Sequence, residues 1–215
     1  MTRPAFDLSL YLVTDPALVP RRDLVKVVTA AVAGGVTMVQ LRDKDAGDVE
    51  LVVIARELRA ALPRSVPLIV NDRVAVALAG GAQGVHVGWA DAPMAEARAA
   101  VGPDRLVGQS ATTDDEVAQL DPAQLDYVGL GPFAATATKP DAGAPLGPAR
   151  FAELRRRIAR PVVAIGGIGA TNAGAAIAAG ADGVAVVSAI CGKADPRGAA
   201  AALRAAIDAA RAGRR

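Results

Sequence analysis

The strongest constraint on the fold is a regular alternation of two kinds of segment along the whole chain. Short β-branched and aliphatic runs predict strands at residues 9–14, 37–41, 67–70, 84–87, 105–109, 127–130, 162–165 and 183–187. Ala-, Leu- and Arg-rich runs predict helices at residues 21–33, 48–62, 73–79, 92–101, 114–120, 148–158, 172–179 and 196–212. Such alternation implies parallel strands joined by crossover helices. Eight units within 215 residues predict an α/β protein with a single (β/α)8 TIM-barrel domain over residues 1–215, with a doubly wound open sheet as the alternative.

The ends of several predicted helices carry their own signals. Three helices close on glycine just before a strand, at Ala33-Gly34-Gly35, Ala79-Gly80-Gly81 and Ala179-Gly180-Ala181. Glycine there supplies the left-handed conformation that ends a helix. Thr113 and Glu116 have the spacing of a capping box, and Thr171 is expected to cap the seventh helix. These signals support the regular succession of units.

Composition narrows the class of protein. Hydrophobic residues make up 52% of the chain, which is enough for a core, whereas aromatic residues make up only 3%. The formal net charge is +2, and with so few aromatic side chains a nucleic-acid partner is disfavoured. Cys191 is the single cysteine, and neither a signal-peptide pattern nor an apolar run of roughly 18 residues is present. We expect a cytoplasmic protein without a membrane partner; a homo-oligomer is left open.

Polar side chains gather where the predicted strands end. The βα loops of a barrel converge on one face, where enzymes with this fold keep their active sites. The longest irregular stretch, residues 131–147, also follows a strand, and loops of that length are usually functional. The polar residues at or just after strand ends are Gln40, Arg42, Lys44, Asn71, Asp72, Asp91, Ser110, Thr136, Thr138, Lys139 and Ser188.

Three groups among these residues predict phosphate chemistry. Asp72 and Asp91 are hard oxygen ligands on neighbouring loops, and two carboxylates with phosphate oxygens and waters typically hold Mg²⁺. Arg42, Lys44 and Lys139 are cations that could surround a diphosphate. We therefore expect a magnesium–diphosphate site.

A second phosphate site is expected across the same face. The turn Gly166-Gly167-Ile168 is predicted to open the seventh helix, so that its N–H groups and the helix dipole bind a phosphate. Val187 and Ser188 follow the eighth strand, and barrels often build a phosphate site after strands seven and eight. Two phosphorylated small molecules are the expected substrates.

Several segments resemble the thiamine phosphate synthase family. They are QLRDKD (40–45), NDRVAVALAGGAQGVHVGWAD (71–91), GQSA (108–111), GPFAATATKPDAGAPLG (131–147), AIGGI (164–168) and GVAVVSAI (183–190). The resemblance runs from Leu10 to Ile190. It implies a transferase that joins 4-amino-5-hydroxymethyl-2-methylpyrimidine diphosphate to a thiazole phosphate, releasing diphosphate and forming thiamine monophosphate with Mg²⁺ as the cofactor.

The resemblance also implies roles for individual residues. Asp72 and Asp91 match the metal ligands. Contacts to the pyrimidine diphosphate match Gln40, Leu41, Arg42, Asp43, Lys44, Asn71, Ser110 and Lys139. Contacts to the thiazole phosphate match Thr136, Ala137, Thr138, Gly167, Val187 and Ser188. Of these, Arg42, Lys44, Ser110 and Lys139 are the expected catalytic residues.

The residue types suit a reaction in which the diphosphate leaves first. An aminopyrimidine can stabilise a developing methylene cation, so the protein's main task is to stabilise charge on the departing group. The thiazole nitrogen is already nucleophilic, and no general base is required. This fits a chain whose one histidine, His86, alternates with Val85 and Val87 and reads mainly as a structural residue inside the barrel.

Two departures and two rival functions accompany this interpretation. Relatives commonly carry histidine at the position of Thr112 and glutamine at that of Trp89. The thiazole tautomerase branch resembles the synthase but performs proton transfer without metal; its histidine corresponds to Thr112, and it lacks a clear counterpart of Asp91. A phosphate-ligand sensor on a barrel scaffold is the rival from another class, and binding without turnover would favour it.

Overall fold

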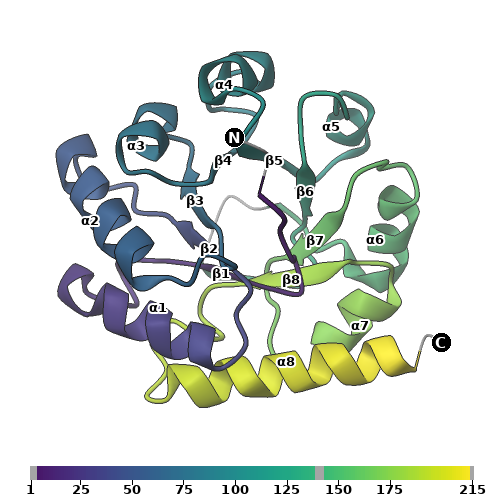
Figure 1. Ribbon diagram of the computed structural model, residues 1–215. Coiled ribbons are helices and arrows are strands. Elements are labelled where there is room, and N and C mark those ends of the chain that lie inside the picture. The colour runs from purple at the N-terminus through teal and green to yellow at the C-terminus, as the bar shows by residue number, and fades with distance from the viewer. Residues whose placement is uncertain (1–3, 139–142, 214–215) are drawn as a thin grey trace.

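A computed structural model describes residues 4–138 and 143–213. Its strands form one closed, fully parallel barrel in the order β1 to β8, with β8 pairing back onto β1. Figure 1 looks along the barrel and shows the helices as an outer ring, with α8 passing beneath β1 and β8 in this view. The predicted TIM barrel is confirmed, and the open-sheet alternative is excluded by the β1–β8 pairing.

The strands and helices follow the predicted alternation closely. The strands are β1 (Leu10–Val13), β2 (Met38–Leu41), β3 (Leu68–Asn71), β4 (Gly84–Val87), β5 (Leu106–Ala111), β6 (Tyr127–Leu130), β7 (Val162–Ile165) and β8 (Gly183–Val186). The helices are η1 (Arg21–Asp23), α1 (Leu24–Ala33), α2 (Asp48–Ala61), α3 (Val74–Ala79), α4 (Met94–Val101), α5 (Asp114–Ala118), α6 (Gly147–Arg155), α7 (Ala173–Ala178) and α8 (Pro196–Ala212).

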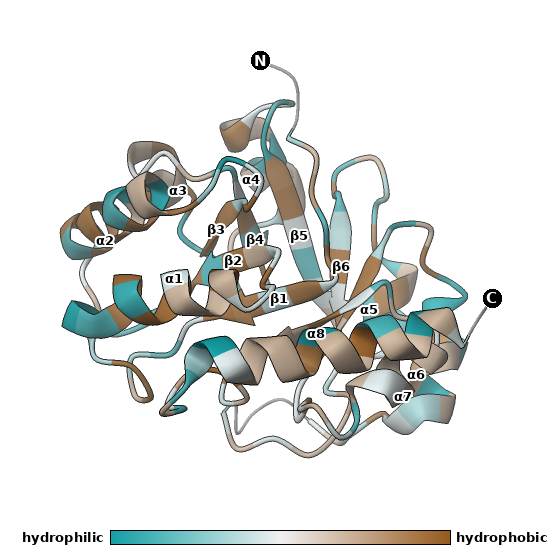
Figure 2. Ribbon diagram, turned by 60° about the horizontal axis from the view of Figure 1, so that its bottom comes forward, coloured by the Kyte–Doolittle hydropathy of each residue, from teal (hydrophilic) through white to brown (hydrophobic). Residues whose placement is uncertain are grey.

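Two hydrophobic clusters build the core. The larger lies between strands and helices, where outward strand residues such as Leu12, Val85 and Val107 meet the apolar faces of the helices. The smaller fills the barrel interior and includes Tyr11 and Tyr127. In Figure 2 most strands are coloured largely hydrophobic, whereas the outer helices have mixed colours. Alternate residues of each strand thus point to different layers, as strand geometry requires.

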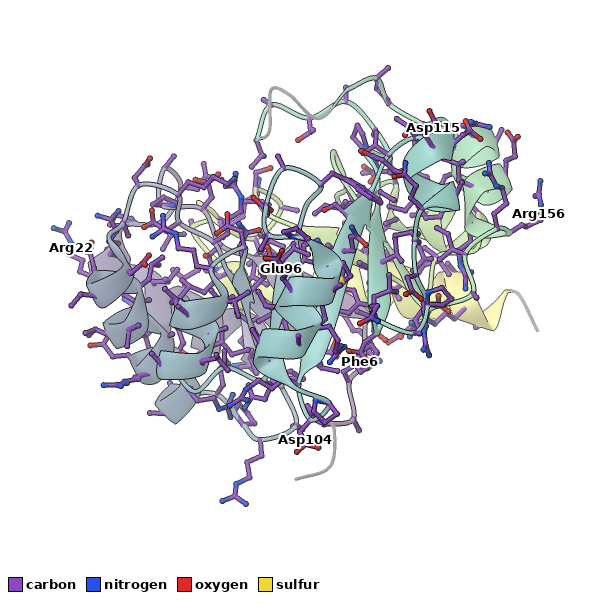
Figure 3. The ribbon with its side chains drawn as sticks, turned by 90° about the horizontal axis from the view of Figure 1, so that it is seen from above. Phe6, Arg22, Glu96, Asp104, Asp115 and Arg156 are labelled. Atoms are coloured by element: carbon purple, nitrogen blue, oxygen red, sulfur yellow. The ribbon has the colours of Figure 1, made fainter. Side chains whose placement is uncertain are left out.

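The two ends of the barrel differ in character. Figure 3 views the barrel from the side, with Arg22 and Asp115, which follow β1 and β5, in its upper half. Phe6 and Asp104, which precede the same strands, lie in its lower half. Phe6 packs against the interior cluster near the lower end. The upper end collects the βα loops, and the polar residues singled out from the sequence lie there.

Most of the predicted helix ends are confirmed. Gly35, Gly81 and Gly180 have φ values of 111°, 71° and 105°, in the left-handed region. Thr113 and Glu116 form both hydrogen bonds of the capping box. The prediction for Thr171 was wrong: Asn172 occupies the position before α7, and its side-chain oxygen accepts from Gly169 N instead of from the helix.

Candidate active site

A cavity of about 500 Å³ opens at the end of the barrel where the βα loops meet. Each of the eight strands, or the loop that follows it, contributes residues to the cavity wall. The predicted site residues that line it are Gln40, Arg42, Lys44, Asn71, Asp91, Ser110, Thr136, Thr138, Gly167, Val187 and Ser188. The structure therefore brings residues from five of the predicted loops and from three strands into one space.

The loop after β2 is held from three directions. The hydroxyl of the buried Thr14 accepts from Arg42 N at 2.9 Å and donates to Arg42 O at 3.1 Å. Asp43 turns inward, where it receives Arg21 Nε at 2.7 Å and the backbone N–H groups of Asp45 and Ala46 at 3.0 Å each. Burial alone would raise the pKa of Asp43, but these donors together hold it below its usual value. The loop is thereby fixed with Arg42 and Lys44 at the cavity.

Arg73, which the sequence did not single out, ties this loop to α3. Its guanidinium donates to Ala46 O at 2.6 Å, to Lys44 O at 3.1 Å and to the carboxylate of Asp48 at 2.9 Å. The planar fork of arginine can satisfy several oxygens at once, which a lysine could not do in fixed geometry. Loops β2–α2 and β3–α3 therefore form one unit that carries both cations and the carboxylate of Asp72.

The two predicted metal ligands sit on neighbouring loops and affect each other electrostatically. Burial, followed by the negative charge of Asp91, raises the pKa of Asp72 above its ordinary value. Asp72 accepts from Asn71 Nδ2 at 2.8 Å and lies 3.5 Å from Lys44 Nζ. Asp91 accepts from Gly88 N at 2.7 Å. Two half-buried carboxylates that repel one another suit a divalent cation, because the cation removes the repulsion.

The backbone at Asp72 is unusual. With φ 52°, it is the one non-glycine residue of the described chain in the left-handed region. Asp and Asn tolerate this conformation better than other side chains, and such outliers cluster at functional sites. Asp72 comes directly after Asn71, the last residue of β3, and its N–H still donates to His86 O at 2.8 Å.

The loops after β6 and β7 pack together on the opposite arc of the barrel. Phe133 N donates to Ile165 O at 2.7 Å and Ala134 N to Gly166 O at 3.0 Å. Gly167 has φ 64°, and a Cβ there would collide with Ala135 O and lie 2.7 Å from Ala134 O. This crossing needs glycine for both its conformation and its space.

One part of the predicted phosphate site needs correction. The Gly166-Gly167-Ile168 turn does not open the seventh helix, because α7 begins only at Ala173 and has six residues. The dipole of α7 is therefore not available at Gly167, and only the N–H groups of the turn itself remain as donors from this segment. Val187 and Ser188 lie directly after β8 and line the cavity as expected.

Two residues expected after strands lie inside them. Asn71 is the last residue of β3, and Ser110 lies within β5, which extends to Ala111. His86 of β4 is buried inside the barrel, as predicted, but it also lines the cavity and lies 3.0 Å from Ser110 Oγ through Nε2. Asn71, His86 and Ser110 thus line the cavity from the strands of the barrel itself.

Four of the predicted site residues that the structure describes are not part of the cavity wall. Leu41 points into the outer hydrophobic cluster, and Asp43 faces Arg21. Asp72 and Ala137 are absent from the wall, although Asp72 contacts Lys44, which is part of it. Lys139 lies outside the described residues, and its role stays a prediction.

The cavity also contains residues that sequence reasoning missed. Lys193 follows β8 and adds a cation, and Asn172 lines the wall beside the glycine turn. Thr112, at the position where relatives commonly have histidine, faces the cavity, whereas Trp89 is 40% exposed and lines a separate hollow of about 350 Å³. A cation a few residues after a strand end was the available signal for Lys193.

None of the helices in the described ranges is long and apolar enough to cross a membrane.

Comparison with known proteins shows the family of this chain. A family model described as thiamine monophosphate synthase matches residues 10–190. The chain belongs to this family. The thiamine-phosphate synthase of Xanthobacter autotrophicus is 52% identical over 98% of this chain and 100% of its own length. That of Azorhizobium caulinodans is 50% identical over 96% of this chain and 98% of its own length.

Solved structures support the same assignment to the thiamine monophosphate synthase family. The thiamine phosphate pyrophosphorylase from Pyrococcus furiosus superimposes with a TM-score of 0.85 at 34% sequence identity, covering 94% of this chain and 96% of that one. The resemblance noted from the sequence segments is therefore confirmed over nearly the whole chain. The relatives named here are synthases, which favours the synthase over the tautomerase interpretation.

Proposed function

We propose that this family member is a thiamine-phosphate synthase that condenses 4-amino-5-hydroxymethyl-2-methylpyrimidine diphosphate with a thiazole phosphate. The products are thiamine monophosphate and diphosphate. One observation carries the proposal: a single cavity has two cations and the carboxylate of Asp91 from the β2–β4 arc and a glycine turn from the β6–β8 arc. Two phosphorylated substrates can therefore approach each other across the barrel mouth with their phosphates apart.

The proposed reaction is a substitution at the methylene carbon of the pyrimidine. The C–O bond to diphosphate breaks first, and its electron pair leaves with the diphosphate. The thiazole nitrogen then donates its lone pair to the methylene carbon and forms the new C–N bond. Arg42 and Lys44, held in place by Thr14 and Arg73, would bind the departing oxygens, and Lys139 would join them.

Ser110 and Asn71 serve to orient the pyrimidine in this scheme. Both lie on strands of the barrel, so the ring would be held over the barrel interior with little freedom. Residues 136–138, Gly167, Val187 and Ser188 would hold the thiazole phosphate. Because the thiazole nitrogen is already nucleophilic, the proposed reaction needs neither proton abstraction nor a covalent enzyme intermediate.

The carboxylates fit a magnesium ion. Asp72 and Asp91 would hold it, with remaining ligands from diphosphate oxygens and water, which is how Mg²⁺ usually binds. When bound, the ion would neutralise charge on the departing diphosphate. Lys44, beside Asp72, links the metal ligands to the diphosphate contacts.

The experiment that tests the function combines purified protein, pyrimidine diphosphate, thiazole phosphate and Mg²⁺, and measures thiamine monophosphate with and without EDTA. Parallel reactions with the plain and the carboxylated thiazole phosphate identify the preferred partner by kcat/KM. Product that disappears with chelator supports both the synthase and the metal. Binding of the pyrimidine diphosphate by calorimetry without any product would overturn the synthase and favour the sensor.

A further inference from the structure

A continuous chain of hydrogen bonds runs through the barrel interior beneath the cavity. Gln40 Nε2 donates to the Tyr11 hydroxyl at 2.8 Å, and this hydroxyl lies 2.9 Å from that of Tyr127. His86 continues the chain, with Nδ1 3.1 Å from the Tyr127 hydroxyl and Nε2 3.0 Å from Ser110 Oγ. Its two ends, Gln40 and Ser110, line the cavity, whereas the tyrosines lie below it.

Two glycines make room for this chain. A Cβ at Gly108 would collide with the Tyr127 ring and lie 2.5 Å from both its hydroxyl oxygen and His86 Nδ1. A Cβ at Gly129 would lie 3.3 Å from His86 Cε1. A larger residue at either position of β5 or β6 would press on the imidazole. The hydrogen-bonded pair of Tyr127 and His86 therefore depends on neighbours without side chains.

Donor counting gives the chain a direction. Burial raises the pKa of Tyr11 and of Tyr127 well above ordinary values, so each phenol keeps one proton. Tyr11 accepts from Gln40, and its own proton is directed to Tyr127. Tyr127 then has His86 Nδ1 as its acceptor, and an imidazole with a single N–H would carry it on Nε2, toward Ser110 Oγ.

We propose that Tyr127 is a positioning residue that sets the hydrogen-bond polarity of the pyrimidine site through His86 and Ser110. With Ser110 accepting from His86, its own proton faces the cavity as a donor. With Gln40 Nε2 committed to Tyr11, its Oε1 faces the cavity as an acceptor. This pattern selects a ligand with a ring-nitrogen acceptor beside an amino donor, as in an aminopyrimidine. The ligand's identity rests on the proposed function; the internal chain does not.

The first test observes the tautomer of the His86 imidazole directly and does not require enzymatic activity. Because His86 is the one histidine of the sequence, untagged protein labelled with ¹⁵N-histidine gives a single imidazole spectrum. We expect the neutral Nε2–H form in the wild type, with an altered Nδ1 signal and a mixture of tautomers in Tyr127→Phe. An Nδ1–H form in the wild type, or identical spectra in both proteins, would overturn the proposal even if synthase activity is found.

The second test is a double-mutant cycle with Ser110→Ala. Phenylalanine keeps the ring contacts that Tyr127 makes with Phe6 and Tyr11 and removes only the hydroxyl. Tyr127→Phe should raise the KM for the pyrimidine diphosphate roughly tenfold, the size of one neutral hydrogen bond, and leave the KM for the thiazole phosphate unchanged. In the Ser110→Ala background it should add no further loss. Additive losses would contradict action through Ser110.

Two substitutions of His86 keep the proposal testable if the Tyr127→Phe variant does not fold. His86→Gln retains a side-chain N–H that can reach Ser110, whereas His86→Leu has none. We expect pyrimidine-diphosphate affinity, measured by calorimetry, to fall by only a few fold in the glutamine variant and roughly tenfold in the leucine variant. Equal losses in the two variants would count against a donor at Nε2. Because the ¹⁵N measurement on the wild type requires no activity, it tests the hydrogen-bond chain independently of the proposed reaction.

Discussion

Thr14 and Arg42 lie 28 residues apart in the chain, and the hydroxyl of Thr14 makes two hydrogen bonds with the backbone of Arg42. The hydroxyl accepts from Arg42 N at 2.9 Å and donates to Arg42 O at 3.1 Å. Thr14 directly follows β1, and Arg42 directly follows β2. The pairing continues the contact between these strands beyond their ends and places the Arg42 side chain at the cavity.

Replacement of Thr14 by valine should therefore weaken both the fold and the site. Valine has nearly the same shape but leaves two backbone groups of Arg42 without their partner, at a cost of about 1–3 kcal/mol in the free energy of unfolding. The KM for the pyrimidine diphosphate should rise as well. Urea unfolding and steady-state kinetics measure both effects. Thr29→Val in α1, where the hydroxyl bonds only to helix carbonyls, is the control and should change neither by much.

Gly167→Ala should destabilise the protein and impair use of the thiazole phosphate. Alanine at φ 64° costs about 1–2 kcal/mol, and its methyl group would displace the loop at Ala134 and Ala135. Gly169→Ala is a matched control, because a Cβ at Gly169 meets no atom within 4 Å. Equal free energies of unfolding for the two variants would show that the Gly167 crossing is not under the expected constraint.

Asp72→Asn should stabilise the metal-free protein at neutral pH while removing the dependence of activity on Mg²⁺ together with the activity. The pKa of Asp72 is raised, mainly by burial and then by Asp91, so its ionised form costs folding free energy. That cost is complete above the raised folded pKa and disappears below the unfolded pKa. Asparagine has no charge and tolerates a positive φ.

Urea titrations in EDTA at pH 7 and near pH 4 test this sign. The advantage of the asparagine variant should shrink as the pH falls. Asp115→Asn, on the exposed first turn of α5, is the control. A variant that is less stable than the wild type at pH 7, or one whose residual activity still titrates with Mg²⁺, would be inconsistent with the proposed ligand.

Cys191 should be inert in the folded protein. Burial raises the pKa of its thiol to about 11, so little thiolate forms at physiological pH. We expect iodoacetamide at pH 8.5 to label Cys191 only after unfolding. Because the unfolded thiol ionises first, wild-type stability should decline relative to Cys191→Ala as the pH rises from about 9 toward 11. Rapid labelling of native protein, followed by mass spectrometry, would disprove this.

Lys139→Ala should lower turnover more than it lowers affinity. If Lys139 binds charge that develops on the departing diphosphate, kcat should fall by about 10²–10³ while the Kd for the pyrimidine diphosphate changes far less. Single-turnover kinetics and calorimetry separate the two quantities. Lys26→Ala, on the exposed side of α1, serves as the control. Equal losses in kcat and affinity would assign Lys139 to ground-state binding.

Local sequence patterns were sufficient to predict much of the architecture. The alternation of strand and helix segments predicts the barrel because each segment's periodicity is a property of neighbouring residues. The capping box at Thr113 and the glycines that end helices act within a few residues of themselves, and the structure confirms them. The placement of Arg42, Lys44 and Asp91 at one face follows from the parallel strand order.

The sequence by itself therefore determined which polar residues reach the mouth of the barrel. The tertiary structure decided how they are held there: by Thr14, by Arg73 bonding to carbonyls 27 and 29 residues away, and by Tyr127 reaching His86 across 41 residues. It also showed that Ser110 lies inside a strand and that the glycine turn stands apart from α7. Such contacts join residues that are distant in the chain, and their directions depend on barrel closure, which no local pattern of residue types contains.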